Sequence, residues 1–223
     1  MSNNFTFKHE KLFLNKELIQ LSNNRFEKIH QENIYQTSLK HVCEIEAKSI
    51  QKEPLFQRIM NEIHKKFQTI INVSDLKFKK LWLVNSFSKN TNHTSLPYIT
   101  HIDKIRYFKA MVYLHDVSLK HGPINLGKVK NNINIEQKRK ELPRDYKDKG
   151  LNTIYDEQID GDLIPMIGNA GDIIFFDTNT PHKAGIIKKG YCRKVLRFDF
   201  ERPFFNPKKP INNSIKNFIN NFI

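Results

Sequence analysis

The sequence predicts a mainly β fold with helices in its N-terminal part. This prediction rests on a change in the spacing of apolar residues along the chain. From Lys8 to about Ile71, apolar residues recur at the three- and four-residue spacing of helices. From Lys79 onward, short β-branched and aromatic runs, separated by glycine and asparagine, replace that spacing. We therefore expect an antiparallel barrel or double sheet flanked by N-terminal helices.

The size and composition of the chain predict one domain. Its 223 residues are enough for one well-buried core, and 39% hydrophobic and 11% aromatic residues are typical of a globular protein. We expect a single domain, 1–223, with a helical part at 1–75, a β core at 76–203 and a helical tail at 204–223.

Helical patterns occur near both ends. In the N-terminal part Pro54 is expected near a helix start, because its missing N–H costs nothing in the first turn. The helix after it would carry its apolar face at Leu55, Ile59, Ile63 and Phe67. The tail carries one apolar helical stripe, which we expect to pack on the protein's own surface, with a dimer contact or a membrane surface as alternatives.

The β core contains five runs that we expect to be strands. They are residues 81–87, 98–100, 108–117, 172–177 and 195–200. Turn signals stand between them at 121–123 and 168–171. A polar insertion at 127–160 separates the two β-rich halves, and we predict that it is a lid or substrate-selecting segment, with a solvated loop as the alternative.

Composition also restricts the partners and the location. No apolar run reaches signal-peptide length or the roughly 20 residues of a membrane span, and only Cys43 and Cys192 are present. We expect reduced thiols and a cytoplasmic location. The net charge of +14 favours an anionic partner, but lysine is scattered and no nucleic-acid motif accompanies it. We expect a small, anionic substrate and no nucleic acid, and the sequence predicts no oligomeric state.

The candidate chemistry lies in His101 and Asp103, after the predicted strand 98–100, and in His182, after the strand 172–177. Residues i and i+2 of a strand point to the same face, so His101 and Asp103 can converge on one ion. Two imidazoles and one carboxylate form the facial triad associated with iron(II) oxygenases. A structural zinc site would have four protein ligands, and no fourth is evident nearby in the sequence.

Several motifs accompany this triad. H-x-D is followed by a Y-L-x-D-V strand end and a G-P turn; later come a G-D-apolar-F-D strand, the distal histidine, and an arginine eleven residues beyond it. Together they resemble the phytanoyl-CoA dioxygenase-like family of Fe(II)/2-oxoglutarate-dependent oxygenases, over roughly residues 80–203. The resemblance implies a double-stranded β-helix (jelly-roll, cupin-like) core, with His101, Asp103 and His182 as ligands of Fe(II), and 2-oxoglutarate and O2 as cosubstrates.

The resemblance also implies that Arg193 binds the distal carboxylate of 2-oxoglutarate, to which a planar guanidinium is matched. Arg197, on the same strand face, is the alternative. Lys109 could add a positive group for the cosubstrate or an anionic substrate, or lie on a solvent face instead. Ala184 departs from the family pattern, in which many relatives carry serine or threonine.

The predicted reaction oxidises a C–H bond of the substrate, by hydroxylation in the first instance, and releases succinate and CO2. Asp103 favours hydroxylation, because related halogenases replace this carboxylate with a small residue. Two alternatives stay open at this point. One is a β-barrel binding protein without catalysis, and the other is an oxygenase that acts on a protein or nucleic acid.

Overall fold

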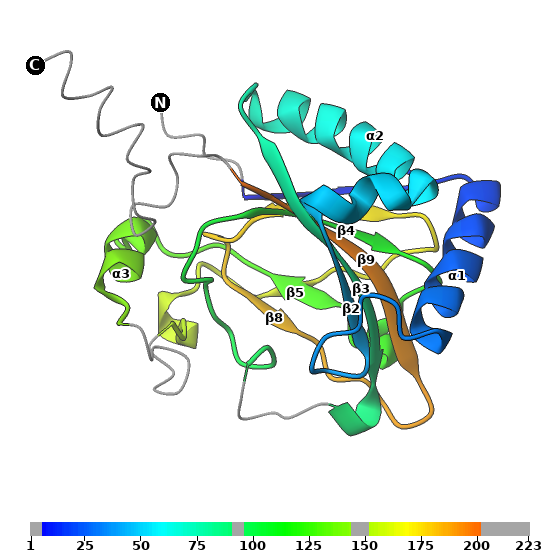
Figure 1. Ribbon diagram of the computed structural model, residues 1–223. Helices are drawn as coiled ribbons and strands as arrows, with labels where there is room; N and C mark the ends of the chain where they lie inside the picture. The colour runs from blue at the N-terminus through cyan, green and yellow to red at the C-terminus, as the bar shows by residue number, and fades with distance from the viewer. Residues whose placement is uncertain (1–5, 91–95, 144–151, 202–223) are drawn as a thin grey trace, which may run out of the picture.

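The computed structural model describes residues 6–90, 96–143 and 152–201, and it contains two sheets that face each other (Figure 1). The helices are α1 (Lys16–Gln31), α2 (Pro54–Ile71) and α3 (Ile135–Glu141). Four 3-10 turns accompany them: η1 (Ala47–Lys52), η2 (Ser88–Asn90), η3 (Leu119–His121) and η4 (Asp156–Gln158). The predicted helix start at Pro54 is confirmed.

The major sheet has the strand order β1-β7-β4-β9-β3-β2, and every neighbouring pair in it is antiparallel. Its strands are β1 (Phe7–Glu10), β2 (Val42–Glu46), β3 (Lys77–Phe87), β4 (Phe108–Tyr113), β7 (Ile173–Asp177) and β9 (Cys192–Glu201). The minor sheet has the order β6-β5-β8, with β5 (Ile124–Leu126), β6 (Ile164–Pro165) and β8 (His182–Ala184).

Helices α1 and α2 cover the outer face of the major sheet (Figure 1). At the centre of this layer, the Phe67 ring of α2 packs edge-on against three rings of the sheet. The ring centroids lie 5.5 Å from Phe108, 4.9 Å from Phe175 and 5.8 Å from Phe200. Burial of such large apolar surfaces holds the helices on the sheet.

Strand β9 shows how the sheet separates its two faces. Leu196, Phe198 and Phe200 belong to the core under the helices, whereas Val195 belongs to the cluster between the two sheets. Because side chains alternate along a strand, Arg193 and Arg197 share the inner face with Val195. The charged side chains of Arg193 and Arg197 therefore lie on the face of the major sheet that is turned toward the minor sheet.

The structure differs from the predicted elements in three places. Strands β1 and β2 lie inside the part predicted to be helical, 1–75, and both complete the major sheet by pairing with distant strands. Residues 98–100 are not a strand; the chain turns there, and only His101 joins a ladder. Whether such short runs become strands depends on which distant segments pair with them, and the local sequence pattern does not encode this pairing. The predicted tail, 204–223, lies outside the described residues.

The insertion 127–160 is partly helical, as α3 and η4, and its residues 144–151 lie outside the description. Its apolar side chains form a small core with Ile102, the residue between two predicted metal ligands. That core contains Ile102, Ile135, Ile154 and Ile159, with Val129, Ile133 and Leu163 packed against it. Among the described helices, none is long and apolar enough to cross a membrane.

Candidate metal centre

The two predicted histidine ligands lie directly opposite each other. The N–H of His101 donates to the carbonyl of His182 at 3.0 Å, and the N–H of His182 donates to the carbonyl of His101 at 3.0 Å. This reciprocal pair adds His101 to the minor sheet beside β8 and brings the ring centroids to 4.4 Å from each other. The pairing brings together residues that the sequence holds far apart.

The ring nitrogens of both histidines are arranged for binding a metal. Nδ1 of His101 lies 2.8 Å from the carbonyl oxygen of Ile99, and Nδ1 of His182 lies 2.8 Å from that of Thr180. A carbonyl only accepts, so each Nδ1 carries a proton, and in a neutral imidazole the lone pair is then on Nε2. A backbone partner on the second nitrogen is the usual way in which proteins orient a metal-binding imidazole.

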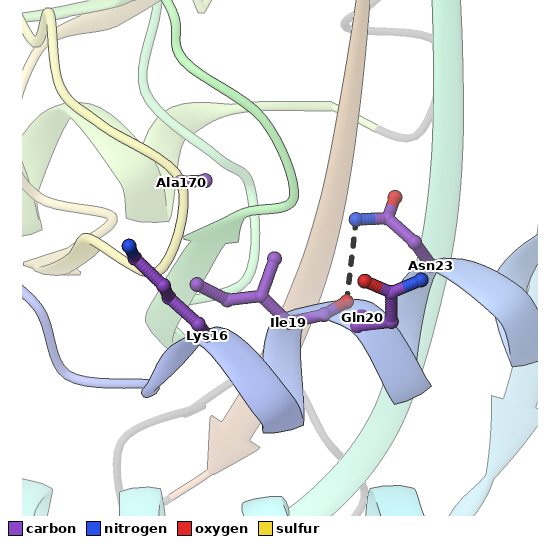
Figure 2. A pocket seen from close by; sticks show the side chains of 5 residues that line it. All are labelled: Lys16, Ile19, Gln20, Asn23 and Ala170. Carbon is purple, nitrogen blue, oxygen red and sulfur yellow. Dashed lines mark hydrogen bonds between the residues drawn. The ribbon is translucent and has the colours of Figure 1, made fainter.

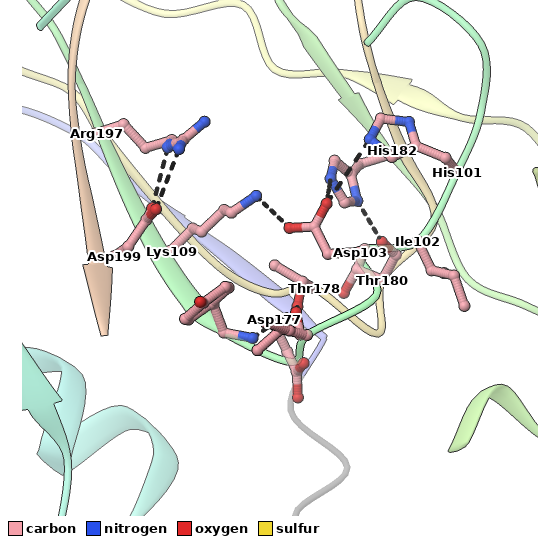
Figure 3. Close-up of polar contacts among 12 residues, drawn as sticks. His101, Ile102, Asp103, Lys109, Asp177, Thr178, Thr180, His182, Arg197 and Asp199 are labelled. Atoms are coloured by element: carbon pink, nitrogen blue, oxygen red, sulfur yellow. Dashed lines mark hydrogen bonds and ion pairs between the residues drawn. The ribbon is translucent and has the colours of Figure 1, made fainter. Parts of the chain in front are cut away.

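Asp103 completes the group (Figure 3). Its Oδ1 lies 3.9 Å from Nε2 of His101 and 3.6 Å from Nε2 of His182, and the three ligand atoms lie within 4.8 Å of one another. Among the described residues, no fourth histidine, cysteine or acidic side chain joins the cluster. The Asp103 side chain is 24% exposed, so the site is open on one side.

The protonation of the site suits a cation. Burial, together with the neighbouring His182, lowers the pKa of His101 to about 3, so that its imidazole is neutral near pH 7. Burial acts to raise the pKa of Asp103, but Lys109 and the two histidines outweigh it and hold that pKa well below its usual range. The neutral His101 nitrogen and the anionic Asp103 oxygen, together with Nε2 of His182, form a ligand set that suits Fe(II) with open coordination positions.

Lys109 is buried on β4, so the predicted alternative of a solvent-facing lysine is wrong. Its Nζ donates to Oδ2 of Asp103 (Figure 3). It also lies 6.0 Å from the centroid of the Phe176 ring. One carboxylate oxygen therefore faces the lysine, while the other faces the histidines. This division favours binding of the ion through a single oxygen of Asp103.

The two candidate arginines differ in their partners. Arg197 donates from Nε and Nη2 to the carboxylate of Asp199, at 3.0 and 3.1 Å. Arg193 is 6% exposed, and its Nε and Nη1 have no hydrogen-bond partner among the described residues. Burial lowers the pKa of Arg193. A buried guanidinium without a counter-ion is costly, so its surroundings fit an anionic ligand that would pair with it.

A second group on the inner face was not predicted. The buried carboxylate of Asp199 also accepts a hydrogen bond from the indole of Trp82 at 2.7 Å. The guanidinium of Arg197 lies 4.6 Å from the Trp82 ring centroid, and Nζ of Lys80 lies 4.5 Å from it. Charged residues at alternate positions in the run VLRFDF are the signal that would have shown this polar face.

In the part of the chain that the structure describes, no other histidine joins the site. His115 and His121 contact each other beyond the opposite end of β4 from Lys109, with ring centroids 5.2 Å apart, and His93 lies outside the described residues. A separate shallow hollow of about 400 Å³ lies beside α1 (Figure 2). It is lined by Lys16, Ile19, Gln20, Asn23 and Ala170, and this lining contains no histidine, cysteine or carboxylate side chain.

No protein-family profile matches the chain, and no curated protein sequence matches it. Solved structures do. The epimerase SnoN, in complex with Fe3+, alpha ketoglutarate and nogalamycin RO, superposes with a TM-score of 0.61 at 14% identity, over 92% of this chain and 83% of SnoN. HygX from Streptomyces hygroscopicus, with nickel and 2-oxoglutarate bound, gives a TM-score of 0.58 at 13% identity, over 90% and 84% of the two chains.

A prolyl-4-hydroxylase from Pseudomonas putida gives a TM-score of 0.55 at 13% identity, over 89% of this chain and 94% of its own. At such low identity these likenesses establish the fold alone. The two facing sheets form a double-stranded β-helix, so the predicted fold class is confirmed.

Proposed function

We propose that the protein is a non-haem Fe(II)/2-oxoglutarate-dependent dioxygenase. The observation that carries the proposal is a buried guanidinium without a described partner, that of Arg193, in the same β-helix as an open three-ligand centre. When bound, iron(II) with 2-oxoglutarate and O2 supplies an oxidation that consumes a substrate C–H bond and releases succinate and CO2. The structures of SnoN and HygX, which hold a metal and the same cosubstrate, support the proposal by their fold.

Each site residue then has a distinct role. His101 and His182 would bind the metal through Nε2, and Asp103 would bind it through Oδ1. Lys109 would keep Oδ2 of Asp103 occupied and so orient the carboxylate. Arg193 would bind the distal carboxylate of 2-oxoglutarate with its unpaired N–H groups. A direct contact of Lys109 with the cosubstrate stays a prediction.

Within this class, the sequence motifs favour the phytanoyl-CoA dioxygenase-like branch, and Asp103 favours hydroxylation. The inner face favours a small anionic substrate. Arg197 is held by Asp199 through Nε and Nη2, which leaves Nη1 for a ligand, and its side chain is 26% exposed. A guanidinium oriented in advance by a buried carboxylate loses little entropy when it binds an anion.

The decisive experiment is an anaerobic titration of the purified protein with iron(II) and 2-oxoglutarate, followed by the visible metal-to-ligand charge-transfer absorption. We expect a band that needs both additions and is absent in His182→Ala. His64→Ala is the matched control, because His64 packs on the Phe200 ring, with centroids 5.6 Å apart, on the helical side of the sheet. A folded wild-type protein that shows no band would overturn the proposal and leave a binding protein.

A further inference from the structure

The insertion places one buried arginine against both segments that carry the metal ligands. Arg139 of α3 is 3% exposed. Its Nε donates to the backbone carbonyl of Asp103 at 2.9 Å, and its Nη2 lies 3.5 Å from the carbonyl oxygen of Thr178, four residues before His182. A single rigid guanidinium therefore contacts a ligand residue itself and the loop that leads to another.

The orientation of Arg139 is itself fixed by a polar network. Glu136, one helical turn earlier, places Oε2 3.1 Å from Nη1 of Arg139. Its Oε1 accepts from the side-chain amide of Asn179 at 2.8 Å and from Arg106 at 3.0 Å. Arg106 in turn pairs with the buried carboxylate of Asp177, at the end of β7. The short helix is thus attached by charge-assisted hydrogen bonds to the β7–β8 loop.

A second part of the insertion holds the other side of the H-x-D motif. The N–H of Ile102 donates to the carbonyl of Asn152 at 3.0 Å, and the Asn152 side chain returns a bond to the carbonyl of Ile102 at 2.9 Å. The N–H of Ile154 donates to the carbonyl of Thr100 at 2.9 Å. His101 consequently lies between the insertion on one side and β8 on the other.

We propose that the described parts of the insertion, 127–143 and 152–160, form a clamp for the metal ligands and that Arg139 is the positioning residue of Asp103. The inference rests on the proposed metal centre. Lys109 orients the Asp103 side chain, but that leaves the backbone of Asp103, in a loop outside any strand, to be fixed from elsewhere. Arg139 supplies that constraint through the carbonyl. This role differs from that of the predicted lid, because it requires α3 to keep its position during substrate binding and release.

The test measures metal binding without turnover, using Co(II) alone as the probe and its visible d–d absorption as the readout. For Arg139→Met we expect Co(II) to bind about 10- to 100-fold more weakly, the range known for loss of an outer partner of a ligand, with an altered d–d spectrum. Arg139→Lys, which keeps the charge but not the fork, should fall between this variant and wild type.

The matched control is Arg25→Met. Arg25 also donates two short hydrogen bonds to a buried carboxylate, at 2.7 and 2.6 Å from Glu53, but it joins α1 to the residue before α2. It should lower thermal stability without changing the Co(II) affinity or spectrum. If Arg139→Met does not fold, Asn152→Ala tests the clamp from its other side, with a weaker Co(II) affinity expected.

The outcomes separate the two proposals. Wild-type affinity and spectrum in Arg139→Met, or in Asn152→Ala where that variant replaces it, would overturn the clamp and leave the metal centre standing. Equal losses of affinity in Arg139→Met and Arg25→Met would also overturn it, because the effect would then follow stability alone. A folded wild-type protein that binds no Co(II) would overturn the metal centre and the clamp together.

Discussion

The two faces of the major sheet differ in composition, although the same strands supply both. On the outer face, β9 contributes only apolar side chains to the core under α1 and α2: Leu196, Phe198 and Phe200. On the inner face, it contributes charged ones: Arg193, Arg197 and Asp199. Strand β4 repeats the division, with Ala110 and Val112 in the outer core and Lys109 beside Asp103.

This contrast shows how one strand can serve stability and chemistry separately. The outer face gains stability by excluding water from large apolar surfaces. The inner face keeps the Arg193 guanidinium buried without a described partner, which lowers the stability of the ligand-free protein and fits the proposed binding of an anion there. If the division holds, substitutions on the two faces should affect different measurements, and four variants test that expectation.

The largest effect is expected for His182→Ala on the inner side. Binding free energies of about 10–16 kcal/mol for four-ligand zinc sites correspond to roughly 2.5–4 kcal/mol per ligand, so metal affinity should fall about 100- to 1,000-fold. Oxidation should be abolished, while the metal-free variant should unfold within a few degrees of wild type. Metal titration and thermal unfolding measure the two quantities. Retained affinity would show that His182 is not a ligand.

Phe198→Ala makes the opposite change on the outer face. Phe198 is fully buried among the side chains under the helices. Truncation of a buried phenylalanine costs about 3–5 kcal/mol of the free energy of unfolding, which urea denaturation would measure. In the fraction that remains folded, metal affinity should be unchanged. A change of more than a few-fold would show that the two faces are coupled through the strand.

Arg193→Met tests whether the unpaired guanidinium binds 2-oxoglutarate. The affinity for 2-oxoglutarate in the presence of metal should fall roughly 30-fold or more, which is at least about 2 kcal/mol, the low end of the cost of losing a charged partner. The affinity for the metal alone should not change. Calorimetric titration measures both binding steps.

The same variant has a stability signature. Because Arg193 has no described partner, its removal should not destabilise the ligand-free protein. Arg197→Met should destabilise it, since the buried carboxylate of Asp199 would keep only Trp82 among the side-chain partners that the structure describes. Equal loss of stability in both variants would contradict the assignment of Arg193 as the ligand-binding arginine.

The smallest effect is expected from a histidine that neither face uses. The Nε2 of His115 accepts the backbone N–H of Lys194 at 3.1 Å, so this nitrogen must be unprotonated, and burial lowers the pKa of His115. A lowered pKa contributes stability above the unfolded value of about 6.5, and this contribution is lost as the pH falls through the folded pKa. In wild type the free energy of unfolding should therefore fall between pH 7.5 and pH 5.5. In His115→Gln this fall should be smaller, by up to about 1 kcal/mol, and urea denaturation at the two pH values measures it.

The sequence indicates the three candidate metal ligands because such a set of residues is uncommon and its local context is clear, and the structure brings their side chains together. A histidine and an aspartate two residues apart, and a second histidine after a strand, can be recognised without knowing which strands pair. Arg193 is implied by the resemblance to a family that carries an arginine eleven residues beyond the distal histidine. The structure adds how Arg193 differs from Arg197: of the two, only Arg197 has a described carboxylate partner.

The parts that sequence pattern does not reveal all depend on contacts between distant segments. Lys109 meets Asp103 only because β4 and the H-x-D loop lie together, and Arg139 stands in a run of charged residues with no feature that marks it. Strands β1 and β2 are short and gain their structure from their partners. The cytoplasmic location, the anionic substrate and the helical tail stay predictions.

The direct pairing of His101 with His182 has a consequence for how the proposed metal centre would form. The two residues are 182 − 101 = 81 positions apart, so bringing them together closes a long loop, and the entropy of that closure is offset only once both sheets have formed. A nascent chain that ends before β8 has no third ligand to offer. Metal uptake by this chain should therefore follow folding rather than guide it.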